Sequence, residues 1–128
     1  MREPDAEHPC PIDLKAALEY SGGDPGFLLQ LYSVFLEEAR GQVAAIRVAL
    51  AEGRADRMTH AAHTIKGSLR LLGAAETAAV AERLELAGLA SRLDGLEPDV
   101  ARFEAEVARL LRWMEAQLAV SIEKEGSS

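Results

Sequence analysis

The chain has 128 residues, about the length of one ordinary domain, which leaves no room for a second. Its 21 aspartates and glutamates outnumber its 14 lysines and arginines, and the formal net charge is −7. An acidic surface repels nucleic-acid phosphates and anionic lipids, so the charge argues against nucleic-acid binding and against polybasic attachment to membranes.

The sequence also lacks the signals of export and of metal or disulfide frameworks. There is no apolar run of about 18 residues and no apolar signal-peptide core at the start, so we expect a cytoplasmic protein without membrane insertion. Cys10 is the single cysteine, which excludes an internal disulfide and a cysteine-based zinc cluster.

The composition favours helices. Hydrophobic residues make up 48% of the chain but aromatic residues only 5%, and alanine and leucine, both strong helix formers, dominate. No proline lies between Gly26 and Glu97, and no alternating β-branched run of useful length occurs. We therefore predict an all-α domain.

The predicted elements begin after residues 1–11, which are polar and proline-rich and read as a flexible lead-in. Residues 12–20 predict a short helix ended by glycines. Asp24 is a good cap for a long helix from Pro25 to about Ala51. Its apolar stripe has helical spacing and consists of Leu28, Leu31, Phe35, Ala39, Val43, Ile46 and Leu50.

Three further helices are predicted over residues 55–72, 75–90 and 98–122, with residues 123–128 as a disordered tail. Long amphipathic helices joined by short loops favour an antiparallel up-and-down four-helix bundle, here with a short additional N-terminal helix. The domain is therefore expected to span residues 12–122.

The helix over residues 55–72 carries the polar residues of greatest chemical interest. At 100° per residue, its core face is formed by Met58, Ala62, Ile65, Leu69 and Leu72. If His63 defines 0°, Lys66 lies at about −60°, Gly67 at about +40° and Arg70 at about −20°. These four residues form a polar stripe opposite the core.

The stripe has a chemical logic. A neutral imidazole is nucleophilic near pH 7, so an exposed His63 is a candidate phosphoryl acceptor. Lys66, one turn further on, would screen the charge of an attached phosphoryl group. Gly67 in a helix interior costs about 1 kcal/mol relative to alanine, but it bares the backbone beside the histidine for an approaching partner.

The segment His63-Thr64-Ile65-Lys66-Gly67-Ser68, followed by Leu72-Gly73-Ala74, resembles the H-x-[LI]-K-G-[SA] signature of histidine phosphotransfer (HPt) domains. The junction at Ser21-Gly22-Gly23-Asp24 and the pair Leu84-Glu85 also fit the family pattern, so the resemblance extends from about Ile12 to Leu118.

The resemblance implies a phosphorelay intermediate that has no cofactor of its own. His63 would accept a phosphoryl group, by family analogy on Nε2, from an aspartate of a response-regulator receiver domain and pass it to another receiver. The receiver would supply the Mg²⁺. A hybrid sensor histidine kinase is a further candidate partner.

Arg70 departs from the family pattern, which usually has small residues after Gly-Ser. We hypothesise that Arg70 contacts the incoming receiver or the phosphoryl group, although an ordinary solvated charge is the alternative. Leu71, Ser68 and His60 flank the stripe and are candidate partner contacts.

Other interpretations remain open. The motif also fits the phosphoacceptor (P1-like) domain of a chemotaxis-type histidine kinase. A non-catalytic helical adaptor is a further alternative, but His63 argues against it because an adaptor needs no nucleophile. His60 and His63 could share a metal, but two imidazoles without a third ligand make a weak site, so no metal is expected. The chain has no glycine-rich phosphate loop, so autonomous kinase activity is not expected. The apolar stripes are used inside the bundle, which predicts a monomer.

Overall fold

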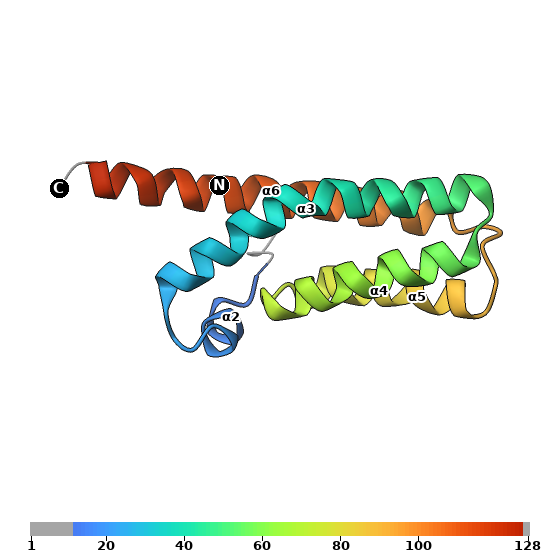
Figure 1. The fold of residues 1–128 in the computed structure, drawn as a ribbon, viewed down its shortest axis with the longest axis horizontal. Helices are drawn as coiled ribbons and strands as arrows, with labels where there is room; N and C mark the ends of the chain where they lie inside the picture. Colours follow the sequence, from blue (N-terminus) through green and yellow to red (C-terminus); the bar gives the residue numbers. More distant parts are fainter. Residues whose placement is uncertain (1–11, 127–128) are drawn as a thin grey trace, which may run out of the picture.

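The computed structural model describes residues 12–126, which form five helices and no strand (Figure 1). The predicted all-α class is confirmed. The helices are α2 (Leu14–Tyr20), α3 (Pro25–Glu52), α4 (Ala55–Leu71), α5 (Ala75–Leu89) and α6 (Glu97–Gly126).

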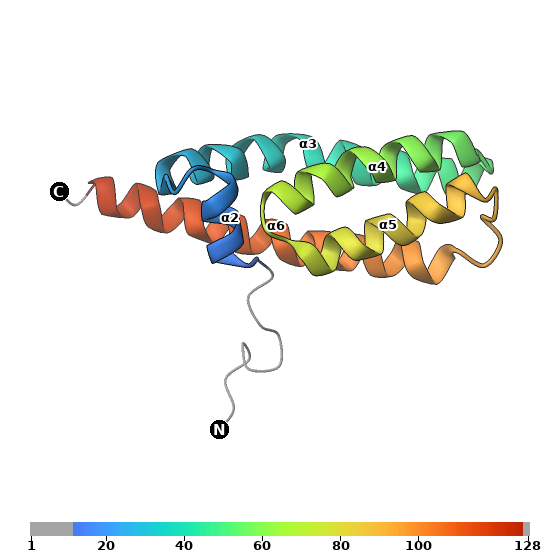
Figure 2. The ribbon, with the colours of Figure 1, turned by 90° about the horizontal axis from the view of Figure 1, so that it is seen from below.

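The four long helices form an antiparallel bundle. Each packs against its neighbour in the chain, and α6 returns to pack against α3, which closes the ring. Figure 2 shows the short helix α2 lying across one end of this bundle. The predicted four-helix bundle with a short N-terminal helix is thus confirmed.

Local sequence signals set the bounds of α3. The Asp24 carboxylate accepts hydrogen bonds from the backbone N–H groups of Gly26 (2.9 Å) and Phe27 (3.3 Å), and Pro25 occupies the first turn. The helix ends at Gly53, whose φ of +66° is the left-handed conformation that glycine adopts without strain.

Helix α2 is attached to the turn that joins α4 and α5. Asp13 caps α2 with its side chain, and its backbone N–H donates to the carbonyl oxygen of Gly73 at 2.8 Å. Gly73 has a φ of +82°, and a Cβ there would lie 2.6 Å from the Asp13 carbonyl oxygen. Both the turn and this contact therefore require glycine at position 73.

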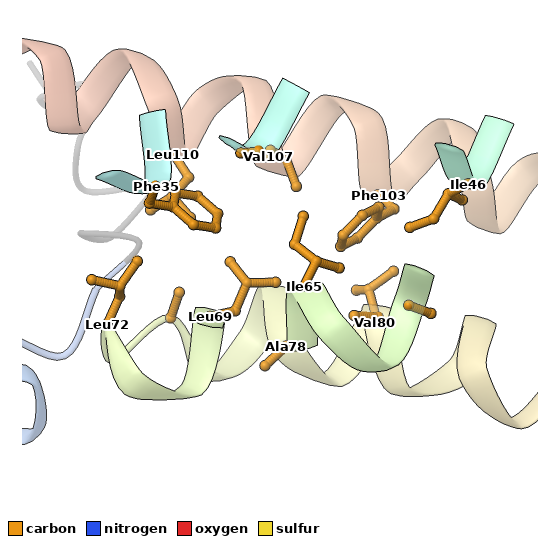
Figure 3. Close-up of a cluster of buried hydrophobic side chains, with 14 of the residues drawn as sticks. Phe35, Ile46, Ile65, Leu69, Leu72, Ala78, Val80, Phe103, Val107 and Leu110 are labelled. Atoms are coloured by element: carbon orange, nitrogen blue, oxygen red, sulfur yellow. The ribbon is translucent and has the colours of Figure 1, made fainter. Parts of the chain in front are cut away.

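The core runs along the bundle axis and receives side chains from all four long helices (Figure 3). Every residue predicted for the core face of α4 is buried. The labelled side chains of Figure 3 are Phe35, Ile46, Ile65, Leu69, Leu72, Ala78, Val80, Phe103, Val107 and Leu110.

The buried stripe of α3 differs from the predicted one at three predicted positions, of which one is Val43, which is only partly buried. Tyr32 and Ala49 are fully buried, whereas the predicted Leu31 and Leu50 are only half-buried. Tyr32 packs edge-on against Trp113 of α6, with ring centroids 5.9 Å apart. The buried position that the apolar pattern assigned to Leu31 is therefore occupied by Tyr32, whose ring packs against an aromatic partner.

The C-terminal helix is longer than predicted. Helix α6 begins at Glu97 and continues to Gly126, beyond the predicted helix of residues 98–122. The added segment contains no helix breaker before its glycine, and glutamate and lysine favour helix. The domain bounds of residues 12–122 and the tail of residues 123–128 stay predictions. The predicted lead-in (1–11) and the last two residues lie outside the described residues.

Within residues 12–126, no helix combines the length and the apolar character that crossing a membrane requires.

Helices α4 and α5 approach closely at Gly88. A Cβ at this position would lie 2.8 Å from the backbone nitrogen of Thr59 and 2.9 Å from the carbonyl oxygen of Ala55. We expect Gly88→Ala to lower the free energy of unfolding by about 1–3 kcal/mol, as overpacking does. The measurement is urea denaturation.

The matched control is Gly41→Ala in the middle of α3, where an added Cβ meets nothing within 4 Å. This variant should raise the free energy of unfolding by about 0.5–1 kcal/mol, because alanine is the better helix former. Equal effects of the two substitutions would contradict the close packing of α4 against α5.

Candidate functional site

His63 lies near the middle of α4 on the face turned away from the core. Its side chain is 68% exposed, while the opposite face of the helix is buried. The predicted exposure of this histidine is therefore confirmed.

A carboxylate from α5 holds the imidazole. Oε2 of Glu85 lies 2.7 Å from Nδ1 of His63. An ionised carboxylate only accepts hydrogen bonds, so Nδ1 must carry the proton and donate it to Glu85. In the neutral imidazole the lone pair is then on Nε2.

Lys66 binds the other oxygen of the same carboxylate. Its ammonium donates to Oε1 of Glu85, and both side chains are only 12% exposed. The expectation that Lys66 lies on an open stripe is thus wrong. Its position on the α5 side of His63 turns its side chain into the helix interface.

These contacts keep Glu85 ionised. The hydrogen bond from Lys66, followed by the one from His63, lowers the pKa of the Glu85 carboxyl below its usual range, against the opposing effect of burial. The two donors together outweigh the desolvation of the carboxylate, so the acceptor for Nδ1 is present at neutral pH.

A second carboxylate lies one turn earlier on α5. Oε1 of Glu82 is 3.4 Å from Nη2 of Arg70 and 4.0 Å from Nζ of Lys66. Arg70 is therefore ion-paired within the chain rather than a freely solvated charge, although its side chain remains 55% exposed.

Gly67 is exposed, and a Cβ added there would meet nothing within 4 Å. It therefore does not permit a close contact between helices. The bare backbone beside His63 faces open space, as the sequence interpretation expects.

Three other residues were predicted to contact a partner: His60, Ser68 and Leu71. His60 is exposed and lies one turn before His63. Ser68 and Leu71 line a shallow groove of about 100 Å³ between α4 and α3. Leu71 is 43% exposed, and Val34 on the α3 wall of the groove is 50% exposed. An apolar surface thus lies beside the polar stripe.

Sequence reasoning missed Glu82 and Glu85 as site residues, although it noted the pair Leu84-Glu85. The signal was in the hairpin geometry: His63 and Glu85 are equally distant in sequence from Ala74, the N-cap residue of α5. In an antiparallel helix pair, such residues lie opposite each other. Leu84 is buried, which fixes the direction in which Glu85 points.

No group of three potential metal-ligating side chains is found in residues 12–126. The exposed pair of His60 and His63 has no third ligand there.

Taken together, these contacts surround one exposed imidazole on α4. The imidazole has a fixed tautomer and a carboxylate behind it, and Lys66 and Arg70 follow it on the same helix.

Comparison with known protein families identifies the family of this chain. The family model of the Hpt domain matches residues 30–113, which is more than half of the chain. The chain therefore belongs to the Hpt family, the histidine phosphotransfer domains of phosphorelays. The matched region is shorter than the stretch from Ile12 to Leu118 over which the sequence resemblance was traced.

A solved structure is similar in fold. The histidine-containing phosphotransfer protein B (HptB) from Pseudomonas aeruginosa PAO1 matches with a TM-score of 0.77 at 20% sequence identity. The match covers 86% of this chain and 95% of that chain. Among curated proteins, none matches the sequence.

The lowered pKa of Glu85 predicts how stability depends on pH. A carboxyl group with a lowered pKa in the folded state stabilises the fold above its unfolded pKa, and this contribution disappears as the pH falls through the folded value. Glu85→Gln should therefore be less stable than wild type at pH 7, and the difference should shrink as the pH falls below the usual range of a glutamate.

Urea denaturation of both proteins between pH 7 and pH 3 measures this difference. A difference that stays constant over this range would show that the ionised form of Glu85 does not carry the stabilisation.

Proposed function

We propose that His63 is the phosphoacceptor of this Hpt domain, taking a phosphoryl group from the aspartate of a response-regulator receiver and passing it to another receiver. The observation that carries the proposal is the contact of Nδ1 with Glu85 at 2.7 Å in a side chain that is 68% exposed. Within the described residues, no hydrogen bond occupies Nε2. The nucleophilic nitrogen therefore faces solvent.

The transfer follows from this arrangement. The Nε2 lone pair attacks phosphorus as the O–P bond of the receiver's aspartyl phosphate breaks, and the leaving carboxylate keeps the bonding electrons. Nδ1 keeps its proton, so the ring becomes a positively charged phosphoimidazolium. The ionised Glu85 stabilises this charge, as a carboxylate does for other catalytic histidines.

The remaining roles follow the positions of the side chains. Lys66 stabilises the phosphoryl charge, and Gly67 gives the receiver access to Nε2. Arg70 reaches the receiver or the phosphoryl group from its exposed position.

The receiver docks over the stripe and the adjoining groove between α3 and α4, where Leu71 and Ser68 meet it and His60 lies at its edge. The receiver also contributes the Mg²⁺, so this chain uses no cofactor of its own. The proposal includes a monomeric carrier in the cytoplasm that has no autonomous kinase activity, with a hybrid sensor kinase as one source of the donor receiver.

The test is transfer of labelled phosphoryl groups from a panel of phosphorylated receiver domains. We expect acid-labile, base-stable label on wild type and none on His63→Gln. Label that is lost from His60→Gln instead would move the assignment to His60. Label on His63→Gln would refute the assignment. Label that comes only from an ATP-loaded kinase domain would favour the P1-like alternative, and no label from either source would favour the adaptor.

Gly67→Ala tests the access role. Since the position is open in the free protein, alanine should raise the free energy of unfolding by about 0.5–1 kcal/mol. The same substitution should slow transfer from a receiver at least severalfold, because the new methyl group lies on the surface that the receiver covers. A quenched-flow, single-turnover experiment measures the rate of phosphoryl transfer, with Gly41→Ala as the matched helix control. An unchanged rate would show that Gly67 does not serve access.

A further inference from the structure

The ion pairs around His63 form a continuous ladder between α4 and α5. Glu85 contacts His63 and Lys66, and Glu82 contacts Lys66 and Arg70. The two contacts of Glu82 use the same oxygen, Oε1, at 4.0 Å from Lys66 Nζ and 3.4 Å from Arg70 Nη2.

The two carboxylates of this ladder have different tasks. Glu85 holds Nδ1 of His63 and is needed whether or not the histidine is phosphorylated. Glu82 has no contact with the imidazole among the interactions found in residues 12–126, and its side chain is 45% exposed. Its only partners there are Lys66 and Arg70, the two cations that follow His63 along α4.

Before transfer, the ladder contains two cations and two carboxylates, so its charges balance. Transfer moves the phosphoryl group from the receiver aspartate to Nε2 and brings about two negative charges to this surface, against one positive charge gained by the imidazolium. The phosphoryl oxygens must then compete with carboxylates for Lys66 and Arg70. Glu82 is the competitor that the imidazole does not need.

We propose that Glu82 weakens the hold of this chain on its phosphoryl group by retaining Lys66 and Arg70, and so sets the equilibrium between phosphohistidine and the receiver's aspartyl phosphate. Glu82 is then a positioning residue that favours onward transfer over storage. This inference rests on the proposed phosphotransfer at His63.

The size of the effect follows from Coulomb's law. Two unit charges about 4 Å apart in a water-like medium interact strongly enough to change an equilibrium constant about fivefold. Because Glu82 is partly exposed and has two cationic partners, a change of about three- to tenfold is expected when its charge is removed.

The experiment measures the equilibrium constant for transfer from one phosphorylated receiver to the full chain. Glu82→Gln should raise the phosphorylated fraction of this chain, with an equilibrium constant about three- to tenfold above wild type. Glu82→Lys should raise it further, because it adds a positive charge at the same place. In an Arg70→Ala background, the effect of Glu82→Gln should be smaller.

The matched controls are Glu106→Gln and Glu106→Lys. Glu106 forms an i, i+4 ion pair with Arg102 on α6, so these variants make the same charge changes and also break an ion pair, but on another helix of the bundle. They should leave the equilibrium constant within twofold of wild type. Circular dichroism and the urea midpoint of each variant verify that the bundle is folded.

The outcomes separate the two proposals. Wild type that is labelled at His63, with Glu82 variants that match the Glu106 controls, would overturn the role of Glu82 and leave the phosphotransfer function standing. Wild type that takes no label from any receiver would overturn both. A rise in the order wild type, Gln, Lys at position 82 supports the proposal.

Discussion

The position and the tautomer of His63 depend on a single carboxylate, that of Glu85. It lies in the interface between α4 and α5, where it accepts from Nδ1 of His63 with one oxygen and from Lys66 with the other. Burial alone would raise its pKa, but its two donors keep the pKa below the usual range and the charge in place. A mobile surface imidazole thereby becomes a fixed ring with its lone pair on the outer nitrogen.

This contact in turn depends on how closely the two helices pack. Gly88 brings the backbone of α5 against Thr59 of α4, one helical turn from the pair that Glu85 makes with His63. The turn at Gly73 sets the register of the hairpin, and the attachment of α2 to that turn stabilises it. The fold therefore acts on the chemistry mainly through one helix hairpin, and the other two long helices supply the core on which it rests.

The sequence predicted those features that depend on local signals or on the helical period. The cap at Asp24 and the buried face of α4 are of this kind. It did not predict the contacts of Glu85, because a cross-helix pair depends on the register of two helices and not on the spacing within one. For the same reason Lys66 was expected in solvent. Its angle on the helix was right, but the neighbour that covers it is on α5.

Gly67 and Gly88, the glycines within the two helices of the hairpin, separate what the fold needs from what the function needs. At Gly88 a side chain would collide with the neighbouring backbone, so packing accounts for the glycine. At Gly67 the space is empty, and a helix interior is destabilised by glycine by about 1 kcal/mol relative to alanine. Nothing within the described part of the chain compensates for this loss. A benefit must then come from outside the isolated chain, and the bare backbone lies one turn beyond the nitrogen that we assign as nucleophile. A protein surface that approaches His63 closely is the partner that would gain from it.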